Sequence, residues 1–221
     1  MTTSADDQDA DRLATESLAA GDATGWFERL YVAATEGSAI VPWDRGAPNA
    51  VLVSWADSRP VSGDRAIVVG CGLGRDSEYV ASLGYDTVAF DVSPTAVAQA
   101  RARHPASTVQ YETADLFDLP AAWRGAFDLV VESHTVQSLP VPLHSAATAA
   151  VSSLVAAGGT LIVLAAVGDD GVVADGPPWP LTRAEIDAFA HDGLTAVGVE
   201  RLVDPSGVDR WRAEFVDRRH G

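Results

Sequence analysis

Residues 65–94 read R-A-I-V-V-G-C-G-L-G-R-D-S-E-Y-V-A-S-L-G-Y-D-T-V-A-F-D-V-S-P, and this stretch decides the fold. Its apolar, β-branched residues 66–69 predict a buried parallel strand. A glycine-spaced turn follows at residues 70–74, then a helix over residues 76–83 and a second strand over residues 87–90. Together these segments predict a β-α-β unit of the nucleotide-binding kind.

The ends of this unit carry the features that a nucleotide requires. The turn glycines let the backbone approach a ligand closely, and Asp91, after the second strand, can accept hydrogen bonds from two ribose hydroxyls. Ser93 and Pro94 then begin another helix with a capping residue and a proline in its first turn. A glycine pattern of this kind serves nicotinamide, flavin and adenosyl cofactors alike, so other residues must separate them.

Length, charge and cysteine content limit the classes of function. A chain of 221 residues fits one α/β domain, and a net charge of −16 disfavours binding to nucleic acid or to an anionic membrane. Cys71 is the single cysteine, which excludes an internal disulfide, and it is expected to act as a small packing residue. With no signal peptide or apolar span in the sequence, a cytoplasmic location is expected. The sequence leaves the oligomeric state open, a homodimer included.

Helical and strand patterns alternate along the rest of the chain. Residues 195–203 and 210–216 predict an antiparallel hairpin at the end. Further helices are predicted at 25–34, 50–56, 95–103, 144–156 and 182–191, and further strands at 108–112, 127–132 and 160–166. The expected fold is α/β: a doubly wound, Rossmann-like, mostly parallel seven-stranded sheet with a C-terminal antiparallel hairpin. Residues 1–24 are expected to be an acidic, partly flexible segment, frayed over about its first ten residues, and residues 25–221 the folded domain.

Two carboxylates favour an adenosyl cofactor with a methionine tail over a dinucleotide. Asp115, in the segment Ala114-Asp115-Leu116 after the third strand, can read an adenine amino group together with a backbone amide. Asp76 begins the helix after the glycine turn, where a pyrophosphate would favour a helix terminus free of carboxylates. An ammonium group, in contrast, would be attracted to Asp76.

At this point the chain resembles a known family. The residues that carry the resemblance are Val69-x-Cys71-Gly72-x-Gly74-x-Asp76, Asp91, Ala114-Asp115, Phe127-Asp128 and Gly158-Gly159-Thr160-Leu161. This set is similar to class I S-adenosylmethionine (SAM) methyltransferases, which makes residues 25–221 the methyltransferase domain. More narrowly, the chain resembles the thiopurine and thiocyanate S-methyltransferase group over residues 24–190. That narrower resemblance rests on Trp26, Pro42-Trp43-Asp44-x-Gly46-x-Pro48, Gly70-Cys71-Gly72 and Gly176-Pro177-Pro178.

The resemblance implies a set of cofactor-binding positions. Asp91 would hold the ribose, Asp115 would read the adenine, and Trp43 would pack on the cofactor. The full set comprises Trp43, Gly70, Cys71, Gly72, Asp76, Asp91, Val92, Asp115 and Leu116. From the residues alone, the proline-rich loop around Trp43 reads equally well as a plain linker.

The acceptor is expected beyond the fourth strand, where Glu132, His134, Gln137 and His144 follow one another. Histidine suits a general base at neutral pH, so His144, His134 and Glu132 are the candidate catalytic residues. The alternative is that His134 hydrogen-bonds its own loop and His144 is solvated. No spacing predicts a metal site.

These residues favour O-methylation of a small hydroxylated acceptor, and the resemblance extends to sugar O-methyltransferases of the methylmannose polysaccharide type. S-methylation of a thiol or thiocyanate is the alternative, since such acceptors need no base. The group commonly carries an arginine near His144, and this departure counts against the thiol activity. A nicotinamide-dependent oxidoreductase and a SAM-binding regulator without catalysis are the alternatives of other classes.

Overall fold

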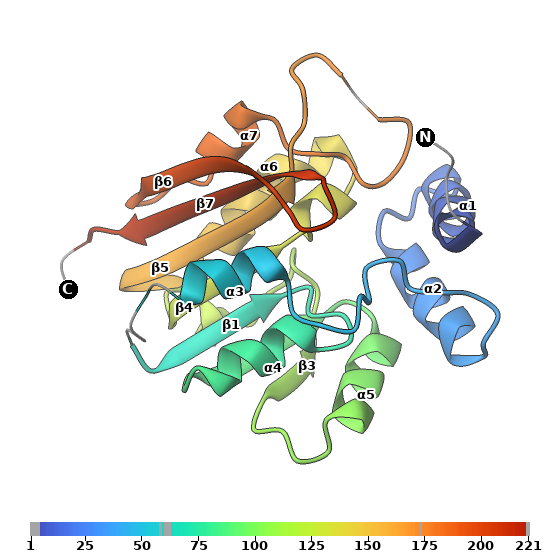
Figure 1. The fold of residues 1–221 in the computed structure, drawn as a ribbon, viewed down its shortest axis with the longest axis horizontal. Helices are drawn as coiled ribbons and strands as arrows, with labels where there is room; N and C mark the ends of the chain where they lie inside the picture. The colour runs from blue at the N-terminus through green and yellow to red at the C-terminus, as the bar shows by residue number, and fades with distance from the viewer. Residues whose placement is uncertain (1–4, 58, 60–62, 173, 220–221) are drawn as a thin grey trace.

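One seven-stranded sheet forms the centre of the molecule, in the order β3-β2-β1-β4-β5-β7-β6 (Figure 1). The computed structural model describes residues 5–57, 59, 63–172 and 174–219. Its strands are β1 (Arg65–Val69), β2 (Asp86–Asp91), β3 (Gln110–Thr113), β4 (Phe127–Ser133), β5 (Val155–Ala166), β6 (Leu194–Val203) and β7 (Asp209–Asp217). The first five are parallel, and β7 is antiparallel to both of its neighbours. The predicted fold class is confirmed.

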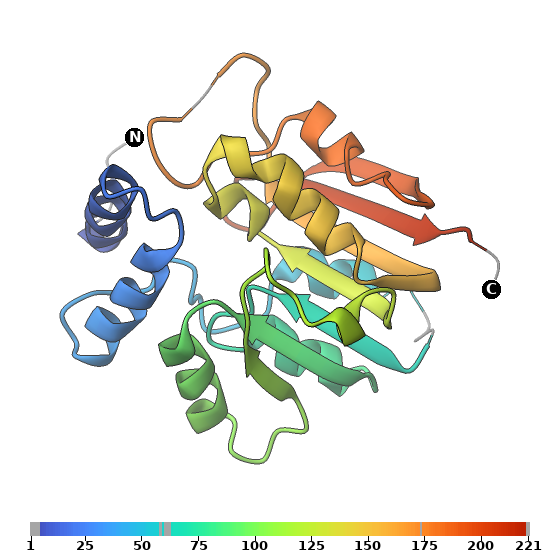
Figure 2. The ribbon, with the colours of Figure 1, turned by 180° about the vertical axis from the view of Figure 1, so that it is seen from behind.

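Helices cover both faces of the sheet (Figures 1 and 2). They are α1 (Ala5–Ala19), α2 (Gly25–Thr35), α3 (Ala50–Ala56), α4 (Arg75–Ser82), α5 (Pro94–Arg103), α6 (Val141–Ser152) and α7 (Arg183–Asp187), with the short 3-10 helices η1 (Ala121–Trp123) and η2 (Val136–Ser138). Helices α3, α4 and α5 share one buried apolar cluster with the sheet, and α6 and α7 share the other. Both faces of the parallel strands are therefore buried, which explains their nearly continuous apolar sequences.

The register of the parallel strands brings four strand ends to one edge of the sheet. Val69 at the end of β1 pairs with Phe90 on one side and with Glu132 on the other. Asp91 at the end of β2 pairs with Thr113 of β3. The loops that leave these strands must therefore meet, as ligand-binding loops do in open α/β sheets. Helices α1 and α2 lie beyond this edge (Figure 1).

Several predicted boundaries differ from the structure, among them the end of α7, which stops at Asp187 rather than at residue 191. Helix α6 begins at Val141 and ends at Ser152, and β5 begins at Val155 rather than at residue 160. The glycine pair 158–159 therefore lies inside a strand, where the pairing with β4 shifts register between Phe127 and Leu129. A glycine in a strand often marks such an irregularity, because only glycine readily adopts the positive φ of 78° found at Gly158.

The N-terminal segment is more regular than its acidic composition predicts. Helix α1 begins at Ala5, so the expectation of fraying over about the first ten residues is wrong for residues 5–10. Ala10, Leu13 and Ala14 pack against Trp26 and Leu30 of α2. The predicted boundary at residue 24 falls in the turn between these two helices.

Candidate functional site

The turn after β1 requires its glycines. Gly70, Gly72 and Gly74 have positive φ angles of 61°, 51° and 88°. A Cβ at Gly70 would lie 2.4 Å from the Thr135 hydroxyl oxygen, and one at Gly72 would lie 2.9 Å from the Tyr31 hydroxyl oxygen. The loop is therefore enclosed by two segments distant in sequence, and only a bare backbone fits between them.

Cys71 contributes backbone rather than a thiol to this loop. Its amide donates to the Phe90 carbonyl oxygen over 2.8 Å and ties the loop to β2. Burial raises the pKa of the Cys71 thiol, with a further contribution from Asp91. A buried thiol with a raised pKa is a packing group rather than a nucleophile, as the sequence predicts.

Asp91 joins the glycine loop to the end of β2. Its Oδ2 accepts from the Gly72 amide and its Oδ1 from the Ser93 amide, each over 2.9 Å. Burial raises the pKa of Asp91 to about 6, and the two amide bonds act in the opposite direction. A carboxylate has about four lone-pair positions, so two remain for further donors such as ribose hydroxyls. Val92, the next residue, is half-buried.

Asp115 lies just past the end of the neighbouring strand β3. Its carboxylate is exposed and accepts a hydrogen bond from the Phe117 amide over 2.9 Å. The Ala114 amide donates to the Asp91 carbonyl oxygen over 3.1 Å, while the Leu116 side chain is buried. The two carboxylates predicted to hold a nucleoside therefore stand on adjacent strand ends.

Aromatic side chains from α2 and the loop after it cover the glycine turn. Trp43 donates from Nε1 to the Tyr31 hydroxyl over 2.8 Å, and its ring packs edge-on against Trp26, Phe27 and Tyr31. The Trp43 side chain is 41% exposed, so one side of it is free to contact a ligand. Its loop is a structured element rather than a plain linker, because Asp44 pairs with Arg75 and Arg103 at 3.2 and 2.7 Å.

Asp76 links the glycine loop to the segment after β4. Its Oδ1 accepts from the Asn49 amide over 2.7 Å, and the Ser133 hydroxyl is a further hydrogen-bond partner. Burial raises the pKa of Asp76, although both hydrogen bonds lower it. Asn49 also donates from Nδ2 to the Ser133 hydroxyl oxygen over 3.2 Å. Asp76 is thus a partly buried carboxylate without a cationic partner among the described residues.

His134 begins the segment that leaves β4, in a strained backbone conformation with φ 64°. Its Nδ1 lies 3.4 Å from the Ser133 hydroxyl oxygen, and its Nε2 is buried with no hydrogen-bond partner among the described residues. The Ser133 hydroxyl can accept a proton from Nδ1 or donate one to it, so Nδ1 is the ring nitrogen that has a partner and Nε2 is the one without.

The surroundings of His134 keep the ring neutral. Burial lowers the pKa of His134 to about 4, and the nearby charges of Arg210 and Arg45 lower it further, while Asp204 opposes them. The ring is therefore unprotonated at neutral pH, and it is a weaker base than an ordinary histidine. A strained backbone and a buried polar atom without a partner are both features that cluster at functional sites.

Glu132 holds this segment through two backbone amides. The side chain is fully buried, and its Oε1 accepts from the Thr135 and Val136 amides over 2.7 and 2.9 Å. Burial raises the pKa of Glu132 to about 7, and its Oε2 has no partner among the described residues. Glu132 thus caps the turn that carries His134. The expectation that it acts as a catalytic group in the crevice is corrected to a positioning role.

His144 is not available as a base. The residue is 3% exposed, its Nδ1 lies 2.7 Å from Glu185 Oε1, and its Nε2 lies 2.8 Å from the Leu139 carbonyl oxygen. Both ring nitrogens face hydrogen-bond acceptors inside the fold, so neither is directed at the ligand edge. The structure gives His144 the role of tying α6 to α7. Gln137 is likewise buried and accepts from the Ala166 amide over 2.6 Å.

Several residues of the site have no signal in the sequence. Tyr31 lies on an apolar helix face and reads as a core residue, and Asn49 and Ser133 read as caps. Glu28 accepts from the Ser93 and Thr95 hydroxyls over 2.5 and 2.6 Å and so fixes α2 to the start of α5. None of these contacts follows from local spacing, because each joins segments far apart in the chain.

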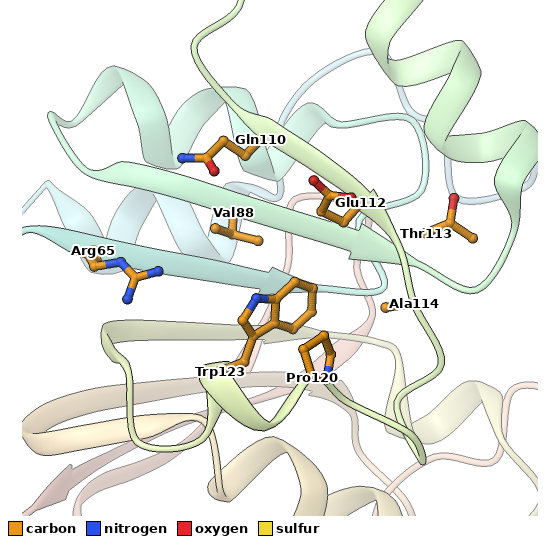
Figure 3. Close-up of a pocket in the computed structure, with 8 residues that line it drawn as sticks. All are labelled: Arg65, Val88, Gln110, Glu112, Thr113, Ala114, Pro120 and Trp123. Carbon is orange, nitrogen blue, oxygen red and sulfur yellow. The ribbon is translucent and has the colours of Figure 1, made fainter.

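A cavity of about 280 Å³ lies on the sheet face beside Trp123, separate from the glycine loop (Figure 3). Arg65 stands at one end of it, and Thr113 and Ala114 stand at the other, nearest the ligand edge. Within the described residues no group of three metal-ligating side chains is found. Nor does any described helix have the length and apolarity to cross a membrane.

Comparison with known proteins finds similar sequences and similar structures. Residues 67–163 match the family model of a methyltransferase domain. The solved structure of the N-methyltransferase NodS from Bradyrhizobium japonicum, in complex with S-adenosyl-L-homocysteine (SAH), aligns with a TM-score of 0.67. Residues 67–163 are thus similar to a methyltransferase domain, and the chain shares its fold with a SAM-dependent methyltransferase of known structure. The NodS alignment has 20% identity and covers 87% of this chain and 97% of that one.

Another solved structure, described for the conversion of a disulfide bond into a thioacetal group during echinomycin biosynthesis, aligns with a TM-score of 0.70. Its identity is 24%, over 87% of this chain and 94% of the other. At identities below 25%, these two structures show that the fold is shared.

Curated relatives match the central part of the chain. Ubiquinone biosynthesis O-methyltransferase from Xanthomonas campestris is 35% identical over 131 residues, which is 55% of this chain and 54% of that protein. The 2-heptyl-1-hydroxyquinolin-4(1H)-one methyltransferase from Mycobacteroides abscessus is 28% identical over 56% of this chain and 55% of its own length. The chain thus spans about half the length of the curated relatives it matches.

Proposed function

We propose that this protein is a SAM-dependent methyltransferase that transfers a methyl group to a hydroxyl of a small molecule. The observation that carries the proposal is that the Gly70–Gly74 loop, Asp91, Asp115 and the segment that begins at His134 all follow strand ends at one edge of the sheet. The first three suit an adenosyl donor, and the last suits an acceptor that must lose a proton.

The residues present fit the donor. The bare backbone of the glycine loop would receive the methionine end, and the two free lone-pair positions of Asp91 would accept from the ribose hydroxyls. Exposed Asp115 would meet the adenine amino group, beside Val92 and Leu116. Asp76, a carboxylate lacking a cationic partner, would compensate a positive charge on the ligand. Bound SAM supplies an activated methyl group, so the protein mainly has to align the acceptor.

His134 is the proposed general base. Removal of the hydroxyl proton by a positioned histidine contributes typically 10²–10⁴-fold. In this proposal Nδ1–H donates to the Ser133 hydroxyl and Nε2 is unprotonated, while Glu132 holds the strained backbone at His134 through the two amides that follow. The Ser138 hydroxyl also donates to the His134 carbonyl oxygen over 2.7 Å. These contacts fix the ring before an acceptor arrives, which is the condition for efficient proton transfer.

An aromatic ring hydroxyl is the acceptor that the surroundings favour. Trp43 and Phe117 are each 41% exposed and supply flat apolar faces on either side of the ligand edge. Relatives whose names specify ubiquinone biosynthesis or a hydroxyquinolone support a ring over a sugar. The sugar and thiopurine resemblances remain narrower hypotheses, and a thiol acceptor would make His134 dispensable.

A pair of calorimetric titrations tests the donor. We expect SAH to bind and NAD not to bind, because the residues match a nucleoside with a methionine tail rather than a pyrophosphate. Transfer of a labelled methyl group from SAM to catechol then tests the reaction. Binding of NAD but not of SAH would contradict the proposed donor. Binding of SAH with methyl transfer only to thiols would contradict the proposed hydroxyl acceptor.

A further inference from the structure

We infer that the methyl acceptor is an organic anion whose carboxylate is bound by Arg45 at the mouth of the acceptor site. This inference rests on the proposed function and specifies the class of its substrate. Three observations support it: the place of the Arg45 loop, the lack of a counter-charge for its guanidinium, and the charges that surround His134.

The loop that carries Arg45 borders the site on both sides. Trp43, two residues earlier, covers the glycine turn, and Asn49, four residues later, donates to Ser133 beside His134. Between them the Arg45 guanidinium reaches the β6–β7 turn, with Nη1 3.4 Å from the Ser206 hydroxyl oxygen. The side chain is exposed and close enough to lower the pKa of His134. Arg45 therefore stands where an acceptor must enter.

The guanidinium of Arg45 has no carboxylate within ion-pair distance in the described part of the chain. Its sequence neighbour Asp44 is held between Arg75 and Arg103. Asp204, at the far side of Ser206, accepts from Ser206 and Val208 and pairs with Arg210 at 2.8 Å. Both nearby carboxylates are therefore committed elsewhere.

A carboxylate is the group that this arrangement fits. Guanidinium binds carboxylates through two parallel hydrogen bonds, which gives orientation as well as affinity. The Ser206 hydroxyl already donates to Asp204 Oδ1 over 2.5 Å, so the guanidinium alone supplies the donors here. A carboxylate here would also offset the positive charge that Arg45 exerts on His134, so that an anionic acceptor would strengthen its own base. The acceptor would then be a hydroxy acid, such as a hydroxybenzoate, rather than a neutral phenol.

The test compares two probes of equal shape in SAH-saturated protein: 3,4-dihydroxybenzoate and 3,4-dihydroxybenzamide. In the wild type we expect the carboxylate to bind about tenfold more tightly than the amide, the range of a charge-assisted hydrogen bond. Arg45→Gln should reduce this ratio to near one, and Arg45→Lys should keep part of it. Arg124→Gln, an exposed arginine far along the chain whose Nη1 lies 3.5 Å from the Ser153 hydroxyl oxygen, controls for net charge and should keep the full ratio.

Turnover gives a second readout. Arg45→Gln should raise the KM for the carboxylate probe about tenfold and leave the KM for the amide unchanged. Equal binding of the two probes in the wild type, a preference that survives Arg45→Gln, or no binding of either probe at millimolar concentration would overturn the inference. SAH affinity separates the two proposals. If SAH does not bind the wild type, the proposed function is wrong; if SAH binds and the carboxylate preference is absent, only the inference about Arg45 is wrong.

Discussion

The hydroxyl oxygen of Ser133 lies 3.4 Å from Nδ1 of His134, and it is the side-chain partner of that ring nitrogen. Ser133 also meets Asn49 and Asp76, the residues that connect this segment to the glycine loop. The donor subsite and the proposed base are therefore joined by one hydrogen-bond network. Tautomer and orientation of a catalytic histidine are commonly set by such a neighbour.

Ser133→Ala should free the tautomer of His134. Without the hydroxyl oxygen, Nδ1–H loses its acceptor, and a share of the ring takes the opposite tautomer with Nε2 protonated. We expect the ¹⁵N spectrum of the imidazole to show this mixture and kcat to fall about tenfold, with SAH affinity unchanged. Ser133→Thr retains a hydroxyl and should restore both, and the remote Ser153→Ala is the control. An unchanged spectrum and rate would show that Ser133 plays no part.

Asp91→Asn should weaken the binding of SAH. The loss of charge removes hydrogen bonds to a carboxylate, worth about 1.5–3 kcal/mol, so calorimetry should show a drop of about tenfold or more in affinity. Asparagine removes the cost of burying a charge, but its single oxygen can accept from only one of the Gly72 and Ser93 amides, so the variant should also unfold at a lower urea concentration. Exposed Asp118→Asn serves as the control. Unchanged SAH affinity would reduce Asp91 to a cap for the Gly72 and Ser93 amides.

Glu132→Gln should flatten the pH dependence of stability. The pKa of Glu132 is raised to about 7 in the native state, whereas an ordinary glutamate ionises near 4.5. Between these values the unfolded chain binds fewer protons than the native one, so the free energy of unfolding falls as pH rises through this window. The whole shift corresponds to roughly 3 kcal/mol. Urea unfolding from pH 4.5 to 8 should show this decline in the wild type and less of it in the variant.

The comparison isolates Glu132, since the other shifted groups are common to both proteins. Asp91 titrates in the same direction, with a pKa raised to about 6, and His134 in the opposite one, with a pKa lowered to about 4. Exposed Glu112→Gln supplies the matched control. Parallel curves for wild type and Glu132→Gln would show that Glu132 is not the source of the slope.

His144→Ala should lower stability and spare turnover. It removes two buried hydrogen bonds, to Glu185 and to the Leu139 carbonyl, and leaves buried acceptors unpaired at a cost of about 2 kcal/mol. We expect a lower midpoint in urea and a kcat within about twofold of the wild type when assayed well below that midpoint. The exposed His191→Ala is the control. Loss of turnover in a stable His144→Ala protein would restore it as a catalytic candidate.

The periodic parts of the sequence predict the fold well. The apolar residues 66–69 and 87–90 lie on either side of a short helix. The first run is followed by the glycine turn and the second by Asp91, so the local pattern agrees with the topology of the sheet. The same logic places Asp91 and Asp115 together, because the carboxyl ends of neighbouring parallel strands share an edge. Where local turn chemistry competes with strand pairing, as at Gly158, the pairing of β5 with β4 and β7 prevails and the predicted turn becomes part of a strand.

The acceptor side is harder to predict, because its contacts come from distant segments. His144 looks like a base in the sequence, but Glu185 lies 41 positions later and turns toward it only when α7 packs on α6. Tyr31 has the spacing of a core residue, and only the folded chain brings its hydroxyl against Gly72. Spacing identifies residues with suitable chemistry, and tertiary packing decides which of them keep a free lone pair.

The most direct measurement is transfer of a labelled methyl group from SAM to catechol by the wild type and by His134→Ala, with SAH affinity measured on both. The account predicts transfer to the ring oxygen by the wild type, a fall in kcat of at least about 100-fold in the variant, and equal SAH affinity. Full turnover by His134→Ala would contradict it.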